Sequence, residues 1–579
     1  MKKVNVFLFI LTVSALTLAG CIKETFPEGE TATSEQLGES AAALESLVNG
    51  IPSQMTQGYL VYGNQTHETD MGYPQFMIAQ TEMLGDMYPL GANSGYDWFR
   101  NYNTFNAAFG ETSYFSYLPW FTLYQFIKSA NDIISSVDIT NESLSSAIKG
   151  SAGIAYACRA FNYYMLTVLF EPVANQYTDC SKVLGLTVPF VTETSDPNNA
   201  KNNPRASHDD MIAFILSDLD RAEQCLTGYT PASRLFPDLA VVYGIKAKVY
   251  LWDENYSKAA EYARKAITSF GSEGTPVSAT QWEDPTAGFC VANQAWMWYV
   301  NYAPNNMRNL CNFTGWMSNE ATWSYSPLAL PSIDRSLYDK IAATDFRKTT
   351  FLHPDKFDFY QYKTVRPASF INNAPAYLAI KFRTKGGDFS SYATGGAVDV
   401  PVMRVEEMYL IEAEAVGVSQ GVSAGVALLN DFMTKYRQPD YNCVTSILRD
   451  FQIEVLTQMR IEFWGEGNAF PTAKRLKPGV IQNYDGTNAP SDIFKLNCEG
   501  IKPNWNLVIP ISEVQANVAL KDFNNPDPTL TVVGPTPIGA YAQPQATNVA
   551  LKYFNPAPVP TAIVIGTTPI GTSQPKLQK

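Results

Sequence analysis

Histidine is scarce in this chain, and the sequence motifs of the common hydrolases are missing. The three histidines, His67, His208 and His353, lie far apart in the sequence. There is no HExxH zinc motif, no GxSxG nucleophile elbow and no glycine-rich phosphate loop. We therefore expect that the protein is not an enzyme and that it uses no cofactor.

Carboxylate pairs do not supply a catalytic constellation either. Glu406-Glu407 and Asp209-Asp210 are adjacent, so on a helix their side chains point in different directions and we expect them to be solvated. Glu462 and Glu466 are four residues apart beside Arg460, which predicts a structural ion network. Glycoside hydrolysis needs two carboxyl groups that face each other. The sequence neither excludes nor supports such a pair between residues of different loops.

Positive charge is in deficit. The chain has 42 Lys and Arg against 55 Asp and Glu, for a formal net charge of −13, and loss of Lys2 and Lys3 with a signal segment changes −13 to −15. Nucleic acid is excluded as the expected partner, because binding phosphates requires a basic face. The negative charge indicates solubility.

Only one long hydrophobic run occurs, at the N-terminus. Lys2 and Lys3 precede the apolar segment Val4–Leu18, which ends in Leu18-Ala19-Gly20-Cys21. This pattern is typical of a lipobox, so we predict a signal peptide over residues 1–20, a lipidated Cys21 and a flexible tether over residues 21–40. The alternative is an ordinary secretory signal in which Cys21 has no role. No later segment reaches the ~18 apolar residues of a membrane span.

The remaining cysteines show no metal-binding spacing. Seven follow Cys21, and none forms a CxxC pair, so zinc is not indicated. Cys158 and Cys225 lie in apolar helical patterns and are expected to be buried. A bridge between Cys290 and Cys311 in an oxidising exterior stays open.

Helical periodicity covers much of the chain. Apolar residues recur at helical spacing in ten segments: Gln36–Val48, Gln75–Leu84, Tyr114–Val137, Ser143–Phe170, Ser207–Leu226, Pro237–Trp252, Tyr256–Phe270, Arg404–Gly417, Val422–Tyr436 and Ser446–Trp464. Between about 271 and 400 this pattern gives way to aromatic-rich, Asn- and Gly-rich sequence. A loop region of this length is expected to be functional.

Three helical segments share one signature. Tyr156-x3-Ala160, Tyr243-x3-Ala247 and Tyr409-x3-Ala413 place an aromatic and a small residue on one face, which we expect to face the interior of a helix pair. Ala259, Ala263 and Ala266 follow the second copy, and Gly425, Leu429 and Phe432 follow the third, at tetratricopeptide spacing. The predicted fold is mostly α, with tetratricopeptide-like helix pairs packed as a globular body beside a large loop-rich, aromatic-rich region.

The chain resembles the SusD/RagB outer-membrane lipoproteins of Bacteroidetes, which bind nutrients at the cell surface. The resemblance extends to about Pro528 and rests on the following stretches: Trp120–Tyr124, Ala130-Asn131, Arg159–Tyr164, Leu169-Phe170, Ala247–Tyr250, Asp345–Arg347, Val402–Ala415, Arg460–Gly467 and Ile509–Asn517. Residues 41–528 are thus expected to form a SusD-like helical domain. Asn468-Ala-Phe-Pro471 departs from the family pattern, which leaves the local helix end open.

The resemblance implies a location and partners. It implies an outer-membrane lipoprotein facing the cell exterior that passes a glycan or peptide ligand to a SusC-like TonB-dependent barrel. Lys23-Glu24 is similar to the export signal of such lipoproteins, although a merely solvated tether explains it equally well.

Aromatic residues in the loop regions are the candidate ligand-binding residues. Flat apolar rings flanked by amide and guanidinium groups suit sugar rings, and they suit peptides nearly as well. The predicted ligand-binding residues are Tyr96, Trp98, Asn101, Trp316, Trp323 and Tyr325. Among them, Trp98, Trp316 and Trp323 are the stronger candidates, because they lie in the loop regions where the resembling family places its ligand. The alternative is that these rings pack the loop region against the helices.

The C-terminal segment contains a tandem repeat. Asn517–Lys521, Phe523-Asn524 and Thr536–Gly539 recur at Asn548–Lys552, Phe554-Asn555 and Thr568–Gly571. Residues 529–579 are therefore predicted to form a Pro-, Gly- and Thr-rich tail. The tail has two interpretations: it is an edge that contacts a partner, or it is a terminal repeat that the protein tolerates.

These observations favour a lipid-anchored nutrient-binding protein. Two alternatives belong to other classes: a surface glycosidase or peptidase, and a helical-repeat scaffold lipoprotein.

Overall fold

The computed structural model of the protein describes residues 40–63, 67–91, 98–105, 109–196, 198–271, 274–355 and 362–530. The predicted signal peptide, Cys21, the tether, Tyr96 and the tail beyond residue 530 lie outside the described residues. Within the described part of the chain, no helix is long and apolar enough to cross a bilayer.

All ten helical segments predicted from periodicity are helices. The long helices are α3 (Ala41–Met55), α4 (Pro74–Leu84), α5 (Tyr114–Ile134), α6 (Ser146–Phe170), α7 (His208–Leu226), α8 (Leu239–Trp252), α9 (Tyr256–Phe270), α16 (Val405–Ser419), α17 (Val422–Tyr436) and α18 (Leu448–Glu462). The helix α19 (Ala469–Leu476) begins directly after Asn468, at the position where the sequence departed from the family pattern.

Short side-chain caps fix where these helices begin. The side chains of Ser113, Ser145, Ser207, Asp238 and Asn255 accept a hydrogen bond from a backbone N–H in the first turns of α5, α6, α7, α8 and α9. Each cap typically stabilises a helix by about 1 kcal/mol. Local sequence therefore determines where these helices begin, which explains why their positions could be predicted from the sequence.

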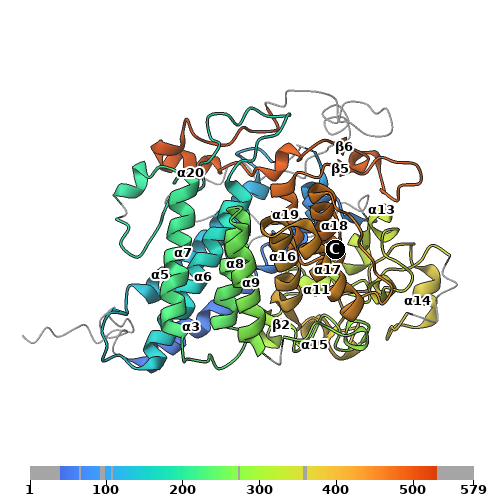
Figure 1. Ribbon diagram of the computed structural model, residues 1–579, viewed down its shortest axis with the longest axis horizontal. Helices are drawn as coiled ribbons and strands as arrows, with labels where there is room; N and C mark the ends of the chain where they lie inside the picture. The colour runs from blue at the N-terminus through green and yellow to red at the C-terminus, as the bar shows by residue number, and fades with distance from the viewer. Residues whose placement is uncertain are drawn as a thin grey trace, which may run out of the picture.

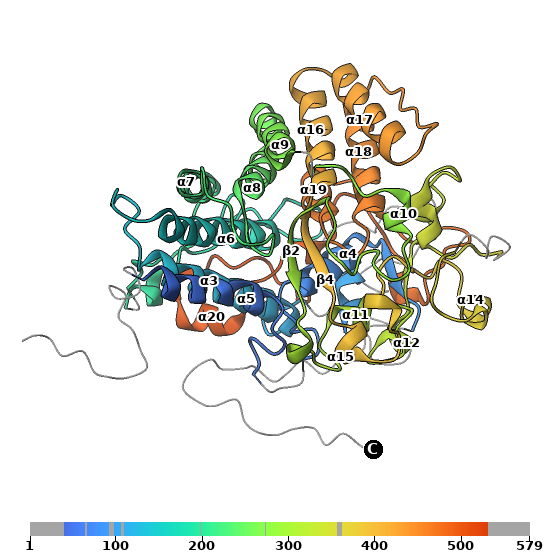
Figure 2. The same cartoon turned by 90° about the horizontal axis from the view of Figure 1, so that it is seen from below.

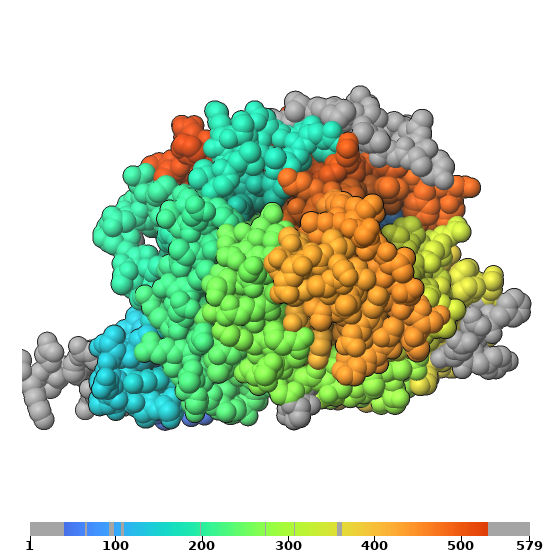
Figure 3. Space-filling view, in the orientation of Figure 1, coloured from blue at the N-terminus to red at the C-terminus, as the bar shows by residue number. Residues whose placement is uncertain are grey.

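The helices pack as neighbours along one side of the molecule. Helix α6 packs against α5 and α7, α8 against α9, and α16 against α9 and α17. In Figure 2 these helices occupy one side of the body, while β2, β4 and the short helices α11, α12 and α15 lie on the other side. Figures 1 and 3 show α7, α8, α9, α16 and α17 forming one continuous face.

Short elements make up the loop-rich side. The short helices are α10 (Ala279–Trp282), α11 (Phe313–Met317), α12 (Ser326–Ala329), α13 (Arg335–Tyr338), α14 (Ala368–Asn373), α15 (Tyr392–Gly395) and α20 (Ile511–Ala516). Three antiparallel strand pairs complete it: β1 (Met87–Pro89) with β3 (Pro331–Ile333), β2 (Trp296–Asn301) with β4 (Asp399–Arg404), and β5 (Val480–Ile481) with β6 (Asn497–Cys498).

The repeated signature marks the helix contacts through its small residues. Ala160, Ala247 and Ala413 are buried, as expected for positions of close approach. At the crossing of α16 and α17, a Cβ on Gly425 would lie 2.5 Å from the Cα of Gly417, so a larger residue there would force the helices apart.

The tyrosines of the signature depart from the prediction. Tyr156 is buried, but Tyr243 and Tyr409 are only half-buried and lie at the outer edge of their helix pairs. The ring of Tyr262 in α9 lies 6.0 Å from that of Tyr243, and Phe432 in α17 lies 5.4 Å from Tyr409. Each tyrosine ring contacts the neighbouring helix near the surface. The alanine one turn later, Ala247 or Ala413, occupies the interior of the helix contact.

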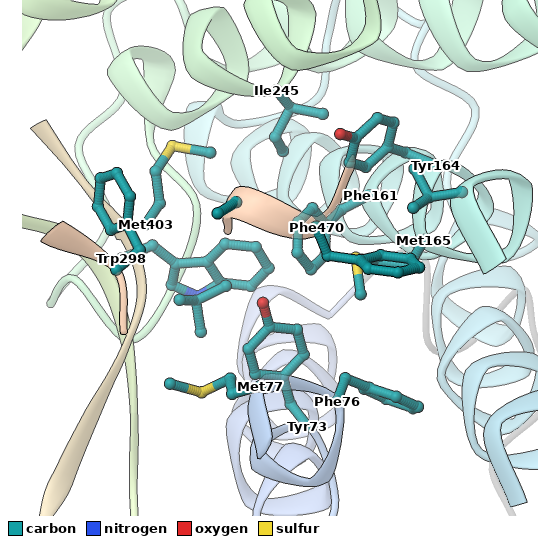
Figure 4. Packing of buried hydrophobic residues seen from close by; sticks show 14 of the residues in the cluster. Tyr73, Phe76, Met77, Phe161, Tyr164, Met165, Ile245, Trp298, Met403 and Phe470 are labelled. Atoms are coloured by element: carbon teal, nitrogen blue, oxygen red, sulfur yellow. The ribbon is translucent and has the colours of Figure 1, made fainter. Parts of the chain in front are cut away.

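One core joins the two sides of the molecule. Figure 4 shows where they meet: Tyr73 at the N-cap of α4, Phe76 and Met77 of α4, Phe161, Tyr164 and Met165 of α6, Ile245 of α8, Trp298 of β2, Met403 of β4 and Phe470 of α19. Trp282, Trp296 and Trp298, three of the aromatic residues of the loop-rich sequence, are buried in this core. For these three the packing interpretation is confirmed.

A buried ion network lies between the helices and the loop-rich side. Its cations are Arg347, Lys381, Arg404 and Arg437, and its anions are Asp345, Glu406, Glu462 and Glu466. All eight side chains are almost fully buried, and the four positive charges balance the four negative charges. The structural network predicted at Glu462 and Glu466 is confirmed.

The prediction of solvated carboxylates holds for one adjacent pair and is wrong for the other. Asp209 and Asp210 are exposed in the first turn of α7. Glu406 and Glu407 are buried, with Glu406 paired to Arg404 and Arg437 and Glu407 paired to Lys248. Their side chains do diverge, but α16 has neighbours on both sides, so each carboxylate meets its own cation.

The cysteines described by the structure are free. Cys158 and Cys225 are buried as predicted. Cys290 and Cys311 do not form a bridge: the sulfur of Cys311 lies 2.7 Å from the carbonyl oxygen of Asp70, and that of Cys290 lies 3.4 Å from the carbonyl oxygen of Thr286.

Asparagines hold the first copy of the C-terminal repeat on the body. The side chain of Asn517 exchanges two hydrogen bonds with the backbone of Asn203, and Asn524 does the same with Ile509. Asn525 donates to two carbonyl groups and accepts from Arg205. The part of the first copy from Asn517 to Asn524 is therefore held in the folded domain, whereas Thr536–Gly539 lie outside the described residues.

Candidate functional site

Three predicted ligand-binding residues come together in one aromatic cluster. Trp98 precedes the 3-10 helix η2 (Phe99–Asn103), Trp316 lies in α11, and Tyr325 precedes α12. The rings of Trp316 and Tyr325 are stacked, with centroids 4.1 Å apart at 12°. The Tyr325 hydroxyl and the Trp98 side chain are hydrogen-bonded. Segments more than 200 residues apart along the chain thus share one site.

Two further rings enclose Trp98. The ring of His67 lies 6.0 Å from the Trp98 ring and that of Tyr114 lies 6.1 Å from it, both edge-on. His67 and Tyr114 also stack on each other at 4.7 Å. Burial lowers the pKa of His67 to about 4, so its imidazole is neutral near pH 7. Sequence reasoning missed both residues, because a lone histidine and a helix-start tyrosine carry no recognisable pattern.

Glu68 places a carboxylate beside the cluster. Its side chain is half-buried and hydrogen-bonds to Tyr325, and burial raises its pKa. One of its oxygens, Oε2, is buried without a hydrogen-bond partner. The carboxylate therefore fixes the position of the Tyr325 hydroxyl.

Asp70 fixes the loop that carries His67 and Glu68. Its Oδ2 accepts hydrogen bonds from the backbone N–H groups of Val61 and Tyr62 at 2.9 and 3.1 Å. Burial raises the pKa of Asp70 to about 6. Thr69 adds a 2.6 Å hydrogen bond to the hydroxyl of Tyr114. The loop is thus fastened on both sides of Glu68.

Burial separates the predicted residues into two groups. Trp98 is half-buried, whereas Asn101, Trp316, Trp323 and Tyr325 are between 2% and 7% exposed. Of these five residues, Trp98 is the most exposed; Tyr325 hydrogen-bonds to it, and Trp316 stacks on Tyr325. Trp323 packs against Gly395 of α15, where an added Cβ would lie 3.0 Å from the indole. Asn101 Nδ2, Trp316 Nε1 and Trp323 Nε1 are buried without partners.

Two hollows lie elsewhere on the described surface. One, of about 310 Å³, is lined by His208, Glu171 and Asp253 among others, and the two carboxylates raise the pKa of His208 to about 9. The other, of about 380 Å³, is lined by residues that include Lys340 and Arg460. Neither lining includes Trp98 or its neighbours. Among the described residues no group of three or more His, Cys, Asp and Glu side chains could hold a metal ion.

Comparison with known proteins shows that the chain is similar to SusD-like proteins. Residues 64–251 match the family model described as "Starch-binding associating with outer membrane". This segment includes Glu68, Trp98 and Tyr114 and runs through most of α8. A curated relative, SusD-like protein P2 of Formosa agariphila, is 24% identical over 500 residues, covering 83% of this chain and 92% of the relative.

Solved structures share the fold. A SusD-like carbohydrate-binding protein from Bacteroides vulgatus superposes with a TM-score of 0.65 at 21% identity, covering 84% of this chain and 98% of that one. A SusD superfamily protein from Bacteroides thetaiotaomicron superposes with a TM-score of 0.62 at 20% identity, covering 84% and 100%. The resemblance to the SusD/RagB family and the mostly helical fold are therefore confirmed.

Proposed function

We propose that the protein is a surface-exposed lipoprotein that binds a glycan or oligosaccharide and delivers it to a SusC-like TonB-dependent outer-membrane transporter. Cys21 carries the lipid anchor in this proposal, and the ligand lies against Trp98. The SusD-like fold supports the proposal, as does the description of the matching family as starch-binding and associated with the outer membrane.

The observation that carries the proposal is the partly exposed Trp98, held by a hydrogen bond to Tyr325 and by edge contacts to His67 and Tyr114. A fixed aromatic ring offers a flat apolar surface to the C–H face of a sugar at little entropic cost. Glu68, which hydrogen-bonds to Tyr325, adds a polar group to the cluster. Ligand sites typically combine apolar and aromatic side chains with a small number of polar groups.

We propose further that the protein acts without catalysis. Glu68, which hydrogen-bonds to Tyr325, and Asp70 lie two residues apart in the chain, and Asp70 is fully buried and bound to backbone N–H groups. A glycosidase needs its two carboxyl groups on opposite sides of the scissile bond. Binding with release of an intact ligand is the function that suits this arrangement.

The test is a titration with plant, host and microbial glycans and with peptides, followed by tryptophan fluorescence and calorimetry. The expected result is saturable binding of at least one glycan, with no shorter products on chromatography after overnight incubation. Cleavage of the ligand would favour the glycosidase or peptidase. Absence of binding to every glycan and peptide would favour the scaffold.

A further inference from the structure

One buried carboxylate holds a lysine and an asparagine from distant parts of the chain. The Nζ of Lys248 lies 2.6 Å from Glu407 Oε1, and the Nδ2 of Asn468 lies 3.0 Å from Glu407 Oε2. Lys248 belongs to α8 and Glu407 to α16, while Asn468 directly precedes α19. The side chains of Lys248 and Glu407 are only 6% and 2% exposed. An amine and a carboxamide thus meet at the two oxygens of one carboxylate inside the protein.

The side chain of Asn468 is directed to Glu407 and not to its own helix. Asn468 is the N-cap residue of α19, a position where an asparagine side chain usually accepts a hydrogen bond from the first helical turn. It makes no such hydrogen bond, and its amide donates to Glu407 instead. This residue begins the stretch 468–471, which departs from the family pattern. The contact with Glu407 therefore positions the amide group.

The surroundings of the three residues are mostly apolar. A cavity of about 10 Å³ lies beside them and is also lined by Tyr164, Leu251, Trp252, Ile411, Met459 and Pro471. This volume holds about one molecule of the size of water. The site is therefore dry apart from this small space, and it has room for one small leaving molecule.

Lys248 is the cation that balances Glu407. Arg475 also lines the cavity, but its guanidinium is bound to both oxygens of Glu414. Burial, together with the charge of Glu407, raises the pKa of Tyr73 and Tyr164, so both phenols stay neutral. Proton exchange at this site is therefore confined to Lys248, Glu407 and the amide of Asn468.

We propose that Lys248 and Asn468 form an intramolecular isopeptide bond, with Glu407 as the residue that transfers the protons. Lys248 gives a proton to Glu407 along their hydrogen bond, and the neutral Nζ adds to Cγ of Asn468. Glu407 passes this proton to Nδ2 and takes another from the attacking Nζ. The Cγ–Nδ2 bond then breaks, and the released ammonia takes the last proton from Glu407 and departs as ammonium. One amide replaces another, so the reaction needs no oxidant and no further reactant.

Burial and positioning both favour this reaction. A low dielectric disfavours separate charges, which brings the ion pair of Lys248 and Glu407 closer in free energy to a neutral amine and a carboxylic acid. Holding the amine and the amide on one carboxylate makes their reaction intramolecular, which removes the entropic cost of bringing them together. The product bond joins α8 to the start of α19 and closes a long loop of the chain.

Peptide mapping by mass spectrometry of the purified full chain, after incubation in the folded state at neutral pH, tests the inference. Trypsin cuts after a free lysine but not after one whose amine is acylated. We expect residues 247–258 and 461–474 to appear as one cross-linked species, lighter than the two separate peptides by one molecule of ammonia. Fragmentation of this species should place the bond between Lys248 and Asn468.

Two variants test the roles of the amine and the carboxylate. Lys248→Arg keeps a cation beside Glu407 but removes the nucleophilic amine, so the cross-linked species should disappear. Glu407→Gln keeps the shape of the side chain but cannot transfer protons, so the cross-linked fraction should fall at least tenfold. Lys246→Arg is the matched control, because Lys246 lies in the same helix with a buried side chain bound to Asp220 and Glu223. It should cross-link as the parent does.

The outcomes separate the parts of the proposal. A parent protein that yields only the unlinked peptides, cut after Lys248, overturns the isopeptide bond, and this result does not depend on any variant folding. Equal cross-linking in Glu407→Gln, shown to be folded by circular dichroism, overturns the role of Glu407. None of these measurements involves a glycan, so the result is independent of the proposed binding function.

Discussion

Arg437 and Glu462 form a fully buried ion pair between the end of α17 and the end of α18. The Arg437 Nε lies 2.7 Å from Glu462 Oε2, and its second amino nitrogen lies 2.9 Å from Oε1. Glu462 also binds Arg347 and Arg404, and these arginines hold its pKa well below the usual range. This carboxylate therefore joins both helices to the loop-rich side.

Arg437→Ala should destabilise the protein by about 3–5 kcal/mol, because it leaves Glu406 and Glu462 with less compensation in a dry interior. Chemical denaturation followed by circular dichroism measures the loss. Lys128→Ala is the control: it breaks an exposed pair with Asp132 and should leave the midpoint almost unchanged. Equal effects of the two variants would contradict the structural role of the network.

Trp98→Ala should weaken glycan binding by about 1–3 kcal/mol while the fold stays intact, because this residue is partly exposed. Trp316→Ala should instead cost about 3–5 kcal/mol of stability, because its ring is 2% exposed and packs on Phe99 and Tyr325. Titration and melting curves for both variants separate the roles. Unaltered binding in folded Trp98→Ala would show that this indole is not the platform.

Cys21→Ala should release the protein from membranes into the soluble fraction, because the anchor we propose is covalent lipid on this residue. Cell fractionation at high salt, with immunoblotting of the full-length chain, measures the partition. Retention of the variant in the membrane pellet would contradict the lipoprotein assignment.

Deleting residues 531–579 should leave the melting temperature and ligand binding nearly unchanged, because the removed segment lies past the point where the family resemblance ends. Asn525→Ala should cost about 1–3 kcal/mol, because it breaks hydrogen bonds to Arg205, Phe170 and Leu507. Differential scanning calorimetry compares the two. A loss of more than ~5 °C on deletion would show that the second repeat packs on the domain.

His208→Gln should remove a stabilising contribution that depends on pH. The pKa of His208 is raised to about 9 by hydrogen bonds and attraction to Glu171 and Asp253, so its contribution is complete below about 6.5 and disappears as pH rises through about 9. The measurement is the difference in unfolding free energy between parent and variant from pH 6 to 10.

The difference in unfolding free energy between parent and variant isolates His208, because other groups change the stability with pH in the opposite direction. Burial lowers the pKa of Lys474 to about 7, which makes its contribution to stability rise with pH. Lys474 is present in both proteins and cancels. A parent-to-variant difference that stays constant up to pH 10 would contradict the charged contact of His208.

The long helices were predictable because their causes are local. The apolar spacing of α5 to α9 and the caps at Ser145, Ser207 and Asp238 lie within a few residues of each helix start. The alanines of the repeated signature likewise marked the helix contacts. The tyrosines did not follow, because the side on which a ring emerges depends on a second helix.

The ion network was predictable only in part. The spacing of Glu462 and Glu466 indicated a network, but their partners come from distant segments, and Arg460 pairs instead with Asp86, 374 residues away. No local pattern contains such a pairing. The same reason explains why Glu406 and Glu407 were expected in solvent.

The sequence by itself determined the class of the fold, the helix positions, the negative charge and the segments that carry the candidate site. The tertiary structure decided which aromatic rings remain accessible. Trp98, Trp316 and Trp323 look alike in sequence, yet burial separates them. It also brought His67 and Glu68 beside Trp98 and Tyr325. Accessibility and pairing are properties of packing between distant segments, and periodicity within one segment does not encode them.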